Sequence, residues 1–372
     1  MAIQKPVLAL NVGSSSIKYA VWCDDEEAMF AGEYDRLAPA DYTATHAKLF
    51  EEVQAKLEGE SLGAIGHRVV HGGSVYTKPV VITDEVIAKL RELIPFAPNH
   101  LPGSIASIEC ARTAYADIPQ VACFDTAFHA TMPSVAQRFA IPRELHDQGI
   151  RRYGFHGLSY QSIMRELACF DPKSLHQRVV VAHLGSGASL CAIVNGKSVD
   201  TTMGLAPNSG IVMGTRCGDI EPEVPLWLCE QAGRTPASVR DMLNHESGLL
   251  GISGISADVR DLLKVESANP AAAEALASFC YSVRKGIAAM AAAAGGCDLL
   301  VFTGGIGAHS AVLRARIMAE LEFLGMQLNE QANASHSAVI SGDGSRVVVC
   351  VIKTDEEATI AQSVIEIMKL EA

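Results

Sequence analysis

The 372-residue sequence lacks the features that mark several large classes of protein. It has no Lys/Arg cluster longer than Arg151-Arg152 and carries a formal net charge of -12, which argues against a nucleic-acid or anionic-membrane surface. Its uncharged stretches, such as residues 179–196, are interrupted by Gly, Ser and His, so none is typical of a membrane span. No signal-peptide cleavage pattern follows the first apolar stretch. We therefore expect a soluble, cytoplasmic protein that binds neither nucleic acid nor membrane.

Cysteines with metal-ligand spacing are also missing. The ten cysteines include no Cys-x-x-Cys pair and no His/Cys ligand pattern, which favours reduced, mostly buried thiols over disulfides or zinc. There is no short-period repeat or low-complexity linker either. With 49% hydrophobic residues, the chain is long enough for two domains of ordinary size, each with its own core.

Common nucleotide-binding motifs are absent as well. There is no Gly-x-x-x-x-Gly-Lys-[Ser/Thr] P-loop, and the third glycine of a dinucleotide-binding motif follows neither Gly185-Ser186-Gly187 nor Gly305-Ile306-Gly307. His67-Arg68-Val69 lacks the catalytic aspartate of protein kinases. If this chain binds a phosphorylated ligand, it must do so by another arrangement.

Two turns rich in glycine and serine are the most informative features present. The first, residues 11–18, and the second, residues 183–189, each lie between two apolar runs, so we expect two β-hairpins. Their glycines let backbone N-H groups approach an anion, their serines add hydroxyl donors, and Lys18 adds a positive charge. Either turn alone could be an ordinary Ser/Gly hairpin. Finding one in each half of the chain favours two regions that bind one polyphosphate.

Predicted strands alternate with predicted helices, which indicates an α/β fold. In the first half we expect helices at 43–57, 84–93 and up to 115, and strands at 64–70 and 120–124. In the second half we expect a helix that starts at Asn269 and ends before Gly295-Gly296, a strand at 299–302, a tight loop at 303–307 and a helix at 310–324. A strand, a glycine loop and a helix N-terminus form a natural nucleotide site. The last helix, 356–370, could pack back on the first half, and a domain boundary is expected near residue 150.

Four polar residues lie beside glycines or at predicted strand ends: Arg68, Asp125, His156 and Arg216. Asp125 directly follows the strand at 120–124, where open α/β sheets place residues that face a ligand. Other interpretations remain open for single residues. Arg68 could be a surface arginine, Asp125 a helix cap, and His156 a hydrogen-bonded core histidine.

Taken together, these motifs resemble those of the acetate kinase family, part of the superfamily of acetate and sugar kinases, heat-shock chaperones and actin. The matching motifs are residues 11–18, 66–73, 124–133, 151–157, 182–189, 213–222, 256–261, 302–307 and 354–361. The resemblance implies an α/β fold of two duplicated ribonuclease-H-like (actin-like ATPase) domains with an interdomain cleft, and usually a homodimer. It implies an acyl and phosphoryl domain at 1–148 plus 357–372, to which the last helix returns, and a nucleotide-binding domain at 149–356.

The resemblance also implies roles for residues. The expected catalytic residues are Asp125, the family's essential acid, His156, its transition-state stabiliser, and Arg216. Arg68 and Arg216 would bind the acyl carboxylate and the migrating phosphate, and Val70, Asn99, Phe155 and Pro207 would form the acyl pocket. Asn11 and Glu356 would hold Mg²⁺ or Mn²⁺, directly or through water, while Ser14, Ser16 and Lys18 would lie near the transferred group. The nucleotide, ATP or ADP, would bind His183, Leu184, Gly185, Ser186, Gly187, Asp258, Val259, Arg260, Gly305, Ile306, Gly307, Ala308 and His309.

The implied reaction is reversible, Mg²⁺-dependent, in-line phosphoryl transfer between ATP and acetate, giving acetyl phosphate and ADP. A carboxylate substrate, with a pKa of roughly 4 to 5, is already ionised at neutral pH and needs no general base. Two arginines, a histidine and Mg²⁺ would instead offset the repulsion between the anions. We therefore expect Asp125 to act through the metal or by orienting Arg68 and Arg216.

Three motifs depart from the family pattern. Ser186 replaces an asparagine, Ala308-His309 replaces Glu-Asn, and Asn99 stands at an apolar position of the acyl loop. Propionate kinase is therefore an alternative, and a pyrophosphate-dependent acyl kinase is a more distant one. A non-catalytic, actin-like nucleotide-binding protein is the alternative from another class. The chain retains Arg68, Asp125, His156, Arg216 and Glu356, which argues against it, because such a protein has no use for a carboxylate clamp.

Overall fold

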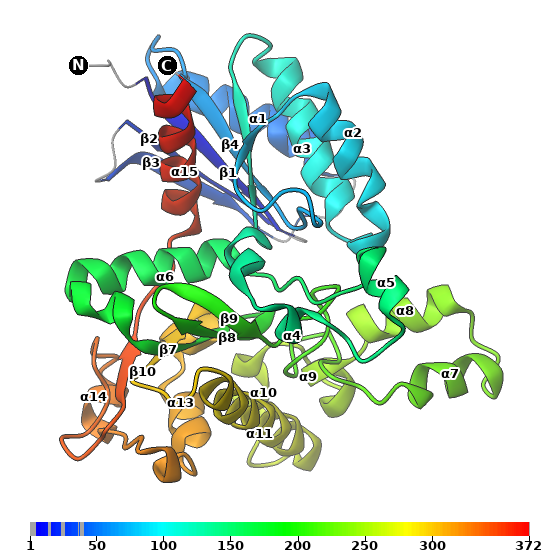
Figure 1. Cartoon of the computed structure of the whole chain (residues 1–372), viewed down its shortest axis with the longest axis vertical. Coiled ribbons are helices and arrows are strands. Elements are labelled where there is room, and N and C mark those ends of the chain that lie inside the picture. The colour runs from blue at the N-terminus through cyan, green and yellow to red at the C-terminus, as the bar shows by residue number, and fades with distance from the viewer. Residues whose placement is uncertain (1–4, 14–15, 24–26, 36, 38–40, 372) are drawn as a thin grey trace. The chain divides into compact units, whose positions relative to one another are not determined.

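The computed structural model describes residues 5–13, 16–23, 27–35, 37 and 41–371. The chain divides into two compact units. Unit 1 comprises Met1–Ala130, Phe155–Ser162 and Asp355–Ala372, and unit 2 comprises Thr131–Gly154 and Ile163–Thr354. Each unit combines one β-sheet with helices, so the α/β fold is confirmed (Figure 1).

Unit 1 is built on a six-stranded sheet in the order β3-β2-β1-β4-β6-β5. Its strands are β1 (Val7–Val12), β2 (Ile17–Trp22), β3 (Ala28–Tyr34), β4 (Ala64–Val69), β5 (Val80–Val81) and β6 (Gln120–Phe124). β1 and β2 form the first expected hairpin, with Val12 opposite Ile17. β1 is also parallel to β4, and β4 to β6. The continuous apolar runs of β1 and β6 agree with burial on both faces of the sheet.

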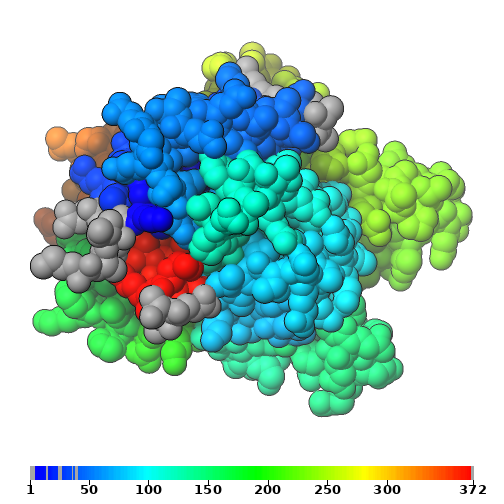
Figure 2. Space-filling view, turned by 90° about the horizontal axis from the view of Figure 1, so that it is seen from above, coloured from blue at the N-terminus to red at the C-terminus, as the bar shows by residue number. Residues whose placement is uncertain are grey.

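Helices cover both faces of this sheet. They are α1 (Tyr42–Lys56), α2 (Asp84–Glu92), α3 (Leu101–Ala114) and the last helix, α15 (Glu356–Glu371). Leu49 and Phe50 of α1 pack on one face, and Ile360 and Val364 of α15 pack on the other. Gly66 on β4 permits this approach, because a Cβ there would lie 2.4 Å from a methyl carbon of Ile360. Figure 2 shows α15, in red, beside the blue segment that contains the first strands.

Unit 2 repeats the strand arrangement of unit 1. Its sheet has the order β11-β10-β7-β8-β9, formed by β7 (Arg178–Leu184), β8 (Ala188–Val194), β9 (Lys197–Thr201), β10 (Leu299–Thr303) and β11 (Val348–Val351). β7 and β8 form the second expected hairpin, and β10 is parallel to both β7 and β11. The antiparallel pairs and parallel neighbours thus follow the same order as in β3-β2-β1-β4-β6, as expected for a duplicated fold.

The remaining helices are mostly short: α4 (Ser134–Gln137), α5 (Arg143–Asp147), α6 (Gly157–Phe170), α7 (Glu223–Glu230), α8 (Pro236–His245), α9 (Gly248–Ser253), α10 (Val259–Val265), α11 (Pro270–Ala293), α12 (Gly304–His309), α13 (Ala311–Met318) and α14 (Glu330–Ala334). The long α11 begins as predicted, because the Asn269 side chain accepts hydrogen bonds from the N-H groups of Ala271 and Ala272. Among the described residues, no helix is long and apolar enough to cross a membrane.

Two predictions for the region after β10 were wrong. Residues 303–307 are not a loop, because α12 begins at Gly304 directly after the strand. Gly304 has φ +76° and approaches β7 so closely that a Cβ would lie 2.6 Å from the carbonyl oxygen of Leu184. The helix expected at 310–324 ends at Met318 and is followed by a short 3-10 turn at Glu322–Leu324. The glycines of residues 303–307 alone suggested a loop. In the structure, Gly304 packs directly on β7, and this close approach allows the helix to begin there.

Candidate functional site

Three neighbouring strands of unit 1 bring polar side chains to one edge of the sheet. Asn11 lies near the end of β1, Arg68 near the end of β4, and Asp125 directly after β6. Parallel strands end at the same edge, which explains why residues so distant in sequence meet. Arg68 Nη2 donates to Asp125 Oδ2 at 2.7 Å, Nε lies 3.1 and 3.2 Å from the two Asp125 oxygens, and Nη1 donates to Asn11 Oδ1 at 3.0 Å.

The start of α15 adds two carboxylates to this group. Asn11 Nδ2 donates to Glu356 Oε2 at 2.9 Å and to Glu357 Oε1 at 2.7 Å. We call these five residues, Asn11, Arg68, Asp125, Glu356 and Glu357, the Arg68 cluster. The sequence analysis did not single out Glu357, although it directly follows Glu356 in the same motif.

The Arg68 cluster is largely buried and contains more carboxyl groups than cations. The Asp125 side chain is 1% exposed and that of Arg68 is 17% exposed. Burial raises the pKa of Asp125 against the opposing effect of Arg68, and burial together with the Glu356 carboxylate raises the pKa of Glu357. Burial alone would lower the pKa of Arg68, but Asp125 and Glu356 outweigh it, and Arg68 stays charged. One guanidinium therefore faces three carboxyl groups.

The donor atoms of this cluster suit a hard divalent cation. Carboxylate and amide oxygens are the ligands that Mg²⁺ prefers, and it commonly takes only one or two from the protein, the others being water and phosphate. Within the described ranges, no group of three His, Cys, Asp or Glu side chains is placed to hold a metal ion. The residues present thus fit a cation held by one or two carboxylates, and Glu356 and Glu357 could supply them.

His156 lies in a loop that is packed against the end of β6. Gly157 N donates to the Asp125 carbonyl at 2.9 Å, and a Cβ on Gly157 would lie 2.2 Å from that oxygen. His156 itself is buried and has φ +61°, a left-handed conformation that side-chain-bearing residues rarely adopt. Backbone strain of this kind is often retained at functional sites. The motif Gly154–Gly157 thus fixes His156 next to the segment that carries Asp125.

An aromatic group lies in the same unit. The ring of His71 stacks on Phe96 with centroids 5.7 Å apart and meets Phe155 edge-on at 5.5 Å. Val70 and Phe155, two residues of the expected acyl pocket, are buried, whereas Asn99 is exposed in the turn before α3. His71 lies in the motif 66–73, but Phe96 was not predicted from the sequence, because nothing in its local pattern distinguishes it from a core residue.

The first glycine-serine turn connects β1 to β2. Ser14 lies outside the described residues. Gly13 N donates to the carbonyl of Ser16 at 2.8 Å, which closes the turn. Lys18 is about half exposed, and its Nζ lies 3.7 Å from Glu33.

Unit 2 contains a cavity of about 810 Å³. It is lined by Gly185, Ser186, Ala257, Asp258, Val259, Arg260, Leu263, Gly305, Ile306, His309, Ser310, Ala311, Val312 and His336. Most of the residues expected to bind nucleotide are in this lining. The exceptions are His183, Leu184, Gly187, Gly307 and Ala308, which lie in β7, its turn or α12 without lining the cavity. The other lining residues were not predicted from the sequence to be part of a binding site: Ala257, Leu263, residues 310–312 and His336.

Backbone contacts shape this cavity. Gly185 N donates to Gly187 O at 3.0 Å, and Gly214 N donates to Ser186 O at 3.1 Å. Asp258 caps α10 by accepting from Arg260 N at 2.8 Å, and it also accepts from the Arg260 guanidinium, which lowers the pKa of Asp258. A large concave site with apolar walls and a few fixed polar groups is typical of a small-molecule site.

Arg216 and Pro207 meet in the loops of unit 2. The Arg216 guanidinium donates to the Pro207 carbonyl, and the Arg216 carbonyl accepts from Met213 N at 3.3 Å. The backbone at Gly248, with φ +60°, packs closely against the backbone of Arg216. A Cβ on Gly248 would lie 2.7 Å from the Arg216 carbonyl oxygen, so glycine is required there. The structure thus groups these two expected site residues with each other.

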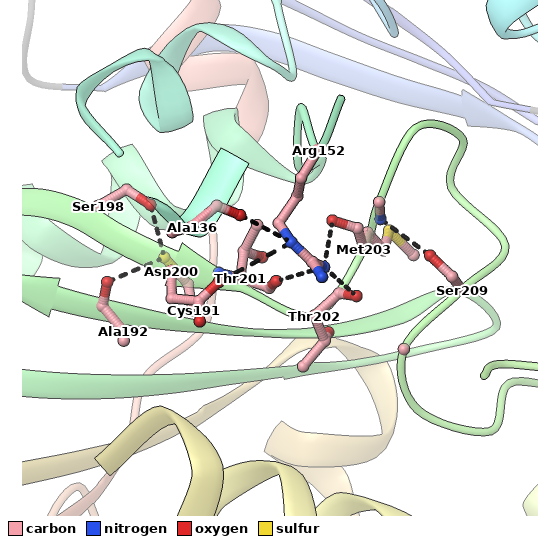
Figure 3. A network of polar contacts seen from close by, with 12 residues as sticks. Ala136, Arg152, Cys191, Ala192, Ser198, Asp200, Thr201, Thr202, Met203 and Ser209 are labelled. Carbon is pink, nitrogen blue, oxygen red and sulfur yellow. Dashed lines mark hydrogen bonds and ion pairs between the residues drawn. The ribbon is translucent and has the colours of Figure 1, made fainter. Parts of the chain in front are cut away.

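Arg152 has a positioning role that the sequence did not reveal (Figure 3). Its Nη1 donates to the carbonyls of Thr201 and Thr202 at 3.0 Å and of Met203 at 3.3 Å, and its Nε donates to Ala136 O at 3.2 Å. One guanidinium thereby joins the end of β9 to the segment that precedes the His156 motif.

Comparison with known proteins points in one direction. Residues 31–362 match the Acetokinase family. Acetate kinase 1 of Neisseria meningitidis serogroup A is 43% identical over 389 residues, which cover 96% of this chain and 97% of that protein. Acetate kinase of Rhodopseudomonas palustris is 42% identical over 388 residues, covering 96% and 97%.

Solved structures give the same result. The crystal structure of Porphyromonas gingivalis acetate kinase superposes with a TM-score of 0.88 at 34% identity, covering 98% of this chain and 100% of that one. A propionate kinase from Francisella tularensis superposes with a TM-score of 0.87 at 35% identity, covering 96% and 98%. The fold of this chain is the two-domain, actin-like α/β fold of these kinases.

Proposed function

The chain belongs to the acetokinase family of phosphotransferases with a carboxyl acceptor, and on that premise we propose that it transfers the γ-phosphoryl group of ATP to acetate. The products are acetyl phosphate and ADP, and the transfer is reversible, direct and in line. The Arg68 cluster is the observation that supports this proposal most strongly. A buried guanidinium, held in one orientation by Asp125 and Asn11, is suited to binding a carboxylate or a phosphate.

Unit 1 would bind the acyl group and the phosphoryl group in transfer. Arg68 binds the carboxylate of acetate, and Asp125 acts as a positioning residue that fixes the plane of the guanidinium. The substrate is ionised at neutral pH, so no side chain has to remove a proton from it. His156 donates to the transferred group, whose equatorial oxygens carry the charge. The family resemblance implies a role near the same group for Ser14, Ser16 and Lys18.

Mg²⁺, or Mn²⁺ in its place, would be held by Asn11 and Glu356, with Glu357 beside them. When bound, the ion neutralises phosphate charge. The chain's own contribution is the arrangement of oxygens around Asn11, whose amide nitrogen orients both carboxylates. An added positive charge is also favourable here because three carboxyl groups face one guanidinium.

Unit 2 would bind the nucleotide. The turn His183–Gly187 binds the phosphates through its N-H groups, and the 810 Å³ cavity takes the nucleoside. Arg216 binds the migrating phosphate. The active form is a homodimer, as the family resemblance implies, and its place is the cytoplasm, as expected from the sequence.

Acetate is the preferred acid in this proposal because several relatives at about 42% identity carry that name. Propionate is the second candidate, since a propionate kinase structure superposes almost equally well. One methylene changes binding by only about 1 to 3 kcal/mol in an apolar pocket, so both acids should be tested together.

The proposal is tested by trapping acyl phosphate with hydroxylamine. Acetate, propionate and butyrate are each combined with ATP or pyrophosphate in the presence of Mg²⁺. We expect hydroxamate with ATP, and most with acetate. No hydroxamate in any combination would contradict an acyl kinase, and product with pyrophosphate alone would reassign the phosphoryl donor.

A further inference from the structure

Arg314 of α13 is a fully buried arginine beside the unit 2 cavity. Its Nη1 donates to the carbonyls of Gly307 and Ala308 at 2.8 and 3.0 Å, and its Nε and Nη2 donate to the side chain and the carbonyl of Asn333 at 2.8 and 3.0 Å. Burial lowers the pKa of Arg314, but a guanidinium remains charged in a protein. None of its partners in the described structure is a carboxylate. A buried charge of this kind is costly, and a functional purpose would explain it.

The remaining contact of Arg314 determines the protonation of His336. Arg314 Nη2 lies 3.2 Å from His336 Nδ1. A guanidinium has only donors, so in this contact His336 Nδ1 accepts, which corresponds to a neutral ring with its proton on Nε2. The Ala308 carbonyl, also 3.2 Å from Nδ1, has two lone pairs and could accept from the opposite tautomer as well. That tautomer would leave one N-H of the buried Arg314 without an acceptor, because the other four already bind Gly307, Ala308 and Asn333, so the contacts favour the proton on Nε2.

His336 is placed where a ligand can use that proton. It lines the cavity, and in the described part of the chain its Nε2 has no hydrogen-bond partner. Its backbone has φ +53°, a conformation that costs a residue with a side chain and that follows the end of α14. Backbone and side chain together hold the imidazole in one orientation.

His309, on the same cavity, provides a contrast. Its Nδ1 lies 3.1 Å from the carbonyl of Gly305, which can only accept. The proton is therefore on Nδ1, and in the neutral ring Nε2 is an acceptor. The two cavity histidines thus differ in role, and only His336 is held as a donor by a buried cation.

We propose that His336 binds the nucleobase, donating from Nε2 to a ring nitrogen of adenine, and that Arg314 is the positioning residue that fixes this tautomer. This inference rests on the proposed function, because it assigns the cavity to a nucleoside. A neutral, directional donor suits an uncharged ring nitrogen, and the apolar neighbours Ile306, Leu263 and Val312 suit the faces of a purine.

The test is calorimetric binding of ADP and of 1-deaza-, 3-deaza- and 7-deaza-ADP, each of which lacks one ring nitrogen. We expect one analogue to bind wild type about tenfold more weakly than ADP, the value of one hydrogen bond in a partly buried site. His336→Leu should bind ADP about tenfold more weakly and should no longer distinguish that analogue from ADP. His245→Leu, on α8 and absent from the cavity lining, is the matched control and should behave as wild type.

Two results would overturn the assignment. In the first, His336→Leu binds all four nucleotides as wild type does. In the second, it weakens all four by the same factor, which would indicate lost packing only. Wild type that binds no ADP at all would overturn the proposed function together with this inference, so the two failures are distinguishable.

The role of Arg314 is tested by the ¹⁵N chemical shifts of the histidine rings. In wild type we expect the Nε2-H tautomer for His336, and in Arg314→Met we expect the Nδ1-H form to become populated. A wild-type spectrum that shows the Nδ1-H tautomer would contradict the proposal, even if the Arg314 variant fails to fold.

Discussion

The two sheets share one strand order, but the groups at their functional ends differ in kind. In unit 1, charged side chains from β4, α15 and the residue after β6 are paired with one another and with Asn11 of β1 in a largely buried cluster. In unit 2, an 810 Å³ cavity is lined mostly by uncharged residues, with Asp258 and Arg260 as a mutually paired acid and base. In the proposed function, a duplicated fold divides one reaction: the charged cluster of unit 1 would bind the group in transfer, and the cavity of unit 2 would bind the nucleoside by its shape.

The largest effect that separates the two regions is expected from Arg68→Ala. Removing the guanidinium leaves Asp125 buried without its partner and removes the anion-binding group. We expect kcat/KM to fall by about 10³-fold or more, while ADP binding in unit 2 stays within about twofold. Arg68→Lys is the control, because it keeps the charge and loses the two-pronged geometry. Loss of ADP binding in both variants would break the division between units.

Arg216→Ala should have the next largest effect. Arg216 lies in unit 2 but is assigned to the migrating phosphate, so its loss should lower kcat by about 10²- to 10³-fold with a smaller change in KM for ATP. Steady-state kinetics with acetate and ATP measures this. An unchanged kcat would show that Arg216 serves only to hold the Pro207 loop.

Lowering the pH should reduce the folding stability of unit 1. Burial lowers the pKa of His67 to about 3 and that of His129 to about 4, below the value of about 6.5 in the unfolded chain. Both are therefore neutral when folded and bind a proton on unfolding once the pH is below about 6.5. The free energy of unfolding should fall by about 1.4 kcal/mol per pH unit for each residue until its folded pKa is reached.

Urea unfolding at pH 7.5, 6.0 and 5.0 checks this expectation. His129→Leu should reduce the slope between pH 6.5 and about 4, because one of the two histidines no longer binds a proton on unfolding. Hydrogen exchange at pH 5 should show earlier opening of the amides of β4 and β6 than of β7 and β10. The same slope in wild type and variant would contradict the assignment.

The smallest effect is expected for Ser186→Asn, which restores the amide that the family resemblance implies. Ser186 is exposed at the cavity, so the larger side chain can be accommodated. We expect KM for ATP to change by less than about tenfold, the value of one added hydrogen bond, with kcat unchanged. A change in kcat of a hundredfold would mean that this turn takes part in the transfer step.

The sequence predicted what is determined locally. The hairpins β1-β2 and β7-β8 follow from glycine and serine between apolar runs, and α11 follows from Asn269, Pro270 and Gly295. Contacts between distant segments could not be predicted in this way. α12 is helical because Gly304 can approach Leu184, and the role of His336 depends on Arg314, which lies 22 residues away in the chain.

The candidate site shows the same limit. The position of Asp125 after a buried strand pointed to a ligand-facing residue, but its partnership with Arg68 and Asn11 depends on the order of β1, β4 and β6 in the sheet. Glu357 was missed because a second glutamate at the start of a helix also has an ordinary explanation, a favourable interaction with the helix dipole.

The central claim, that unit 1 performs the transfer and unit 2 holds the nucleotide, is tested most directly by ³¹P NMR of ATP, acetate and Mg²⁺ with wild type and Arg68→Ala, alongside ADP binding by both. The account predicts equimolar acetyl phosphate and ADP with wild type, almost none with the variant, and similar ADP affinity for the two proteins. Release of inorganic phosphate without acetyl phosphate, or equal turnover by Arg68→Ala, would contradict it.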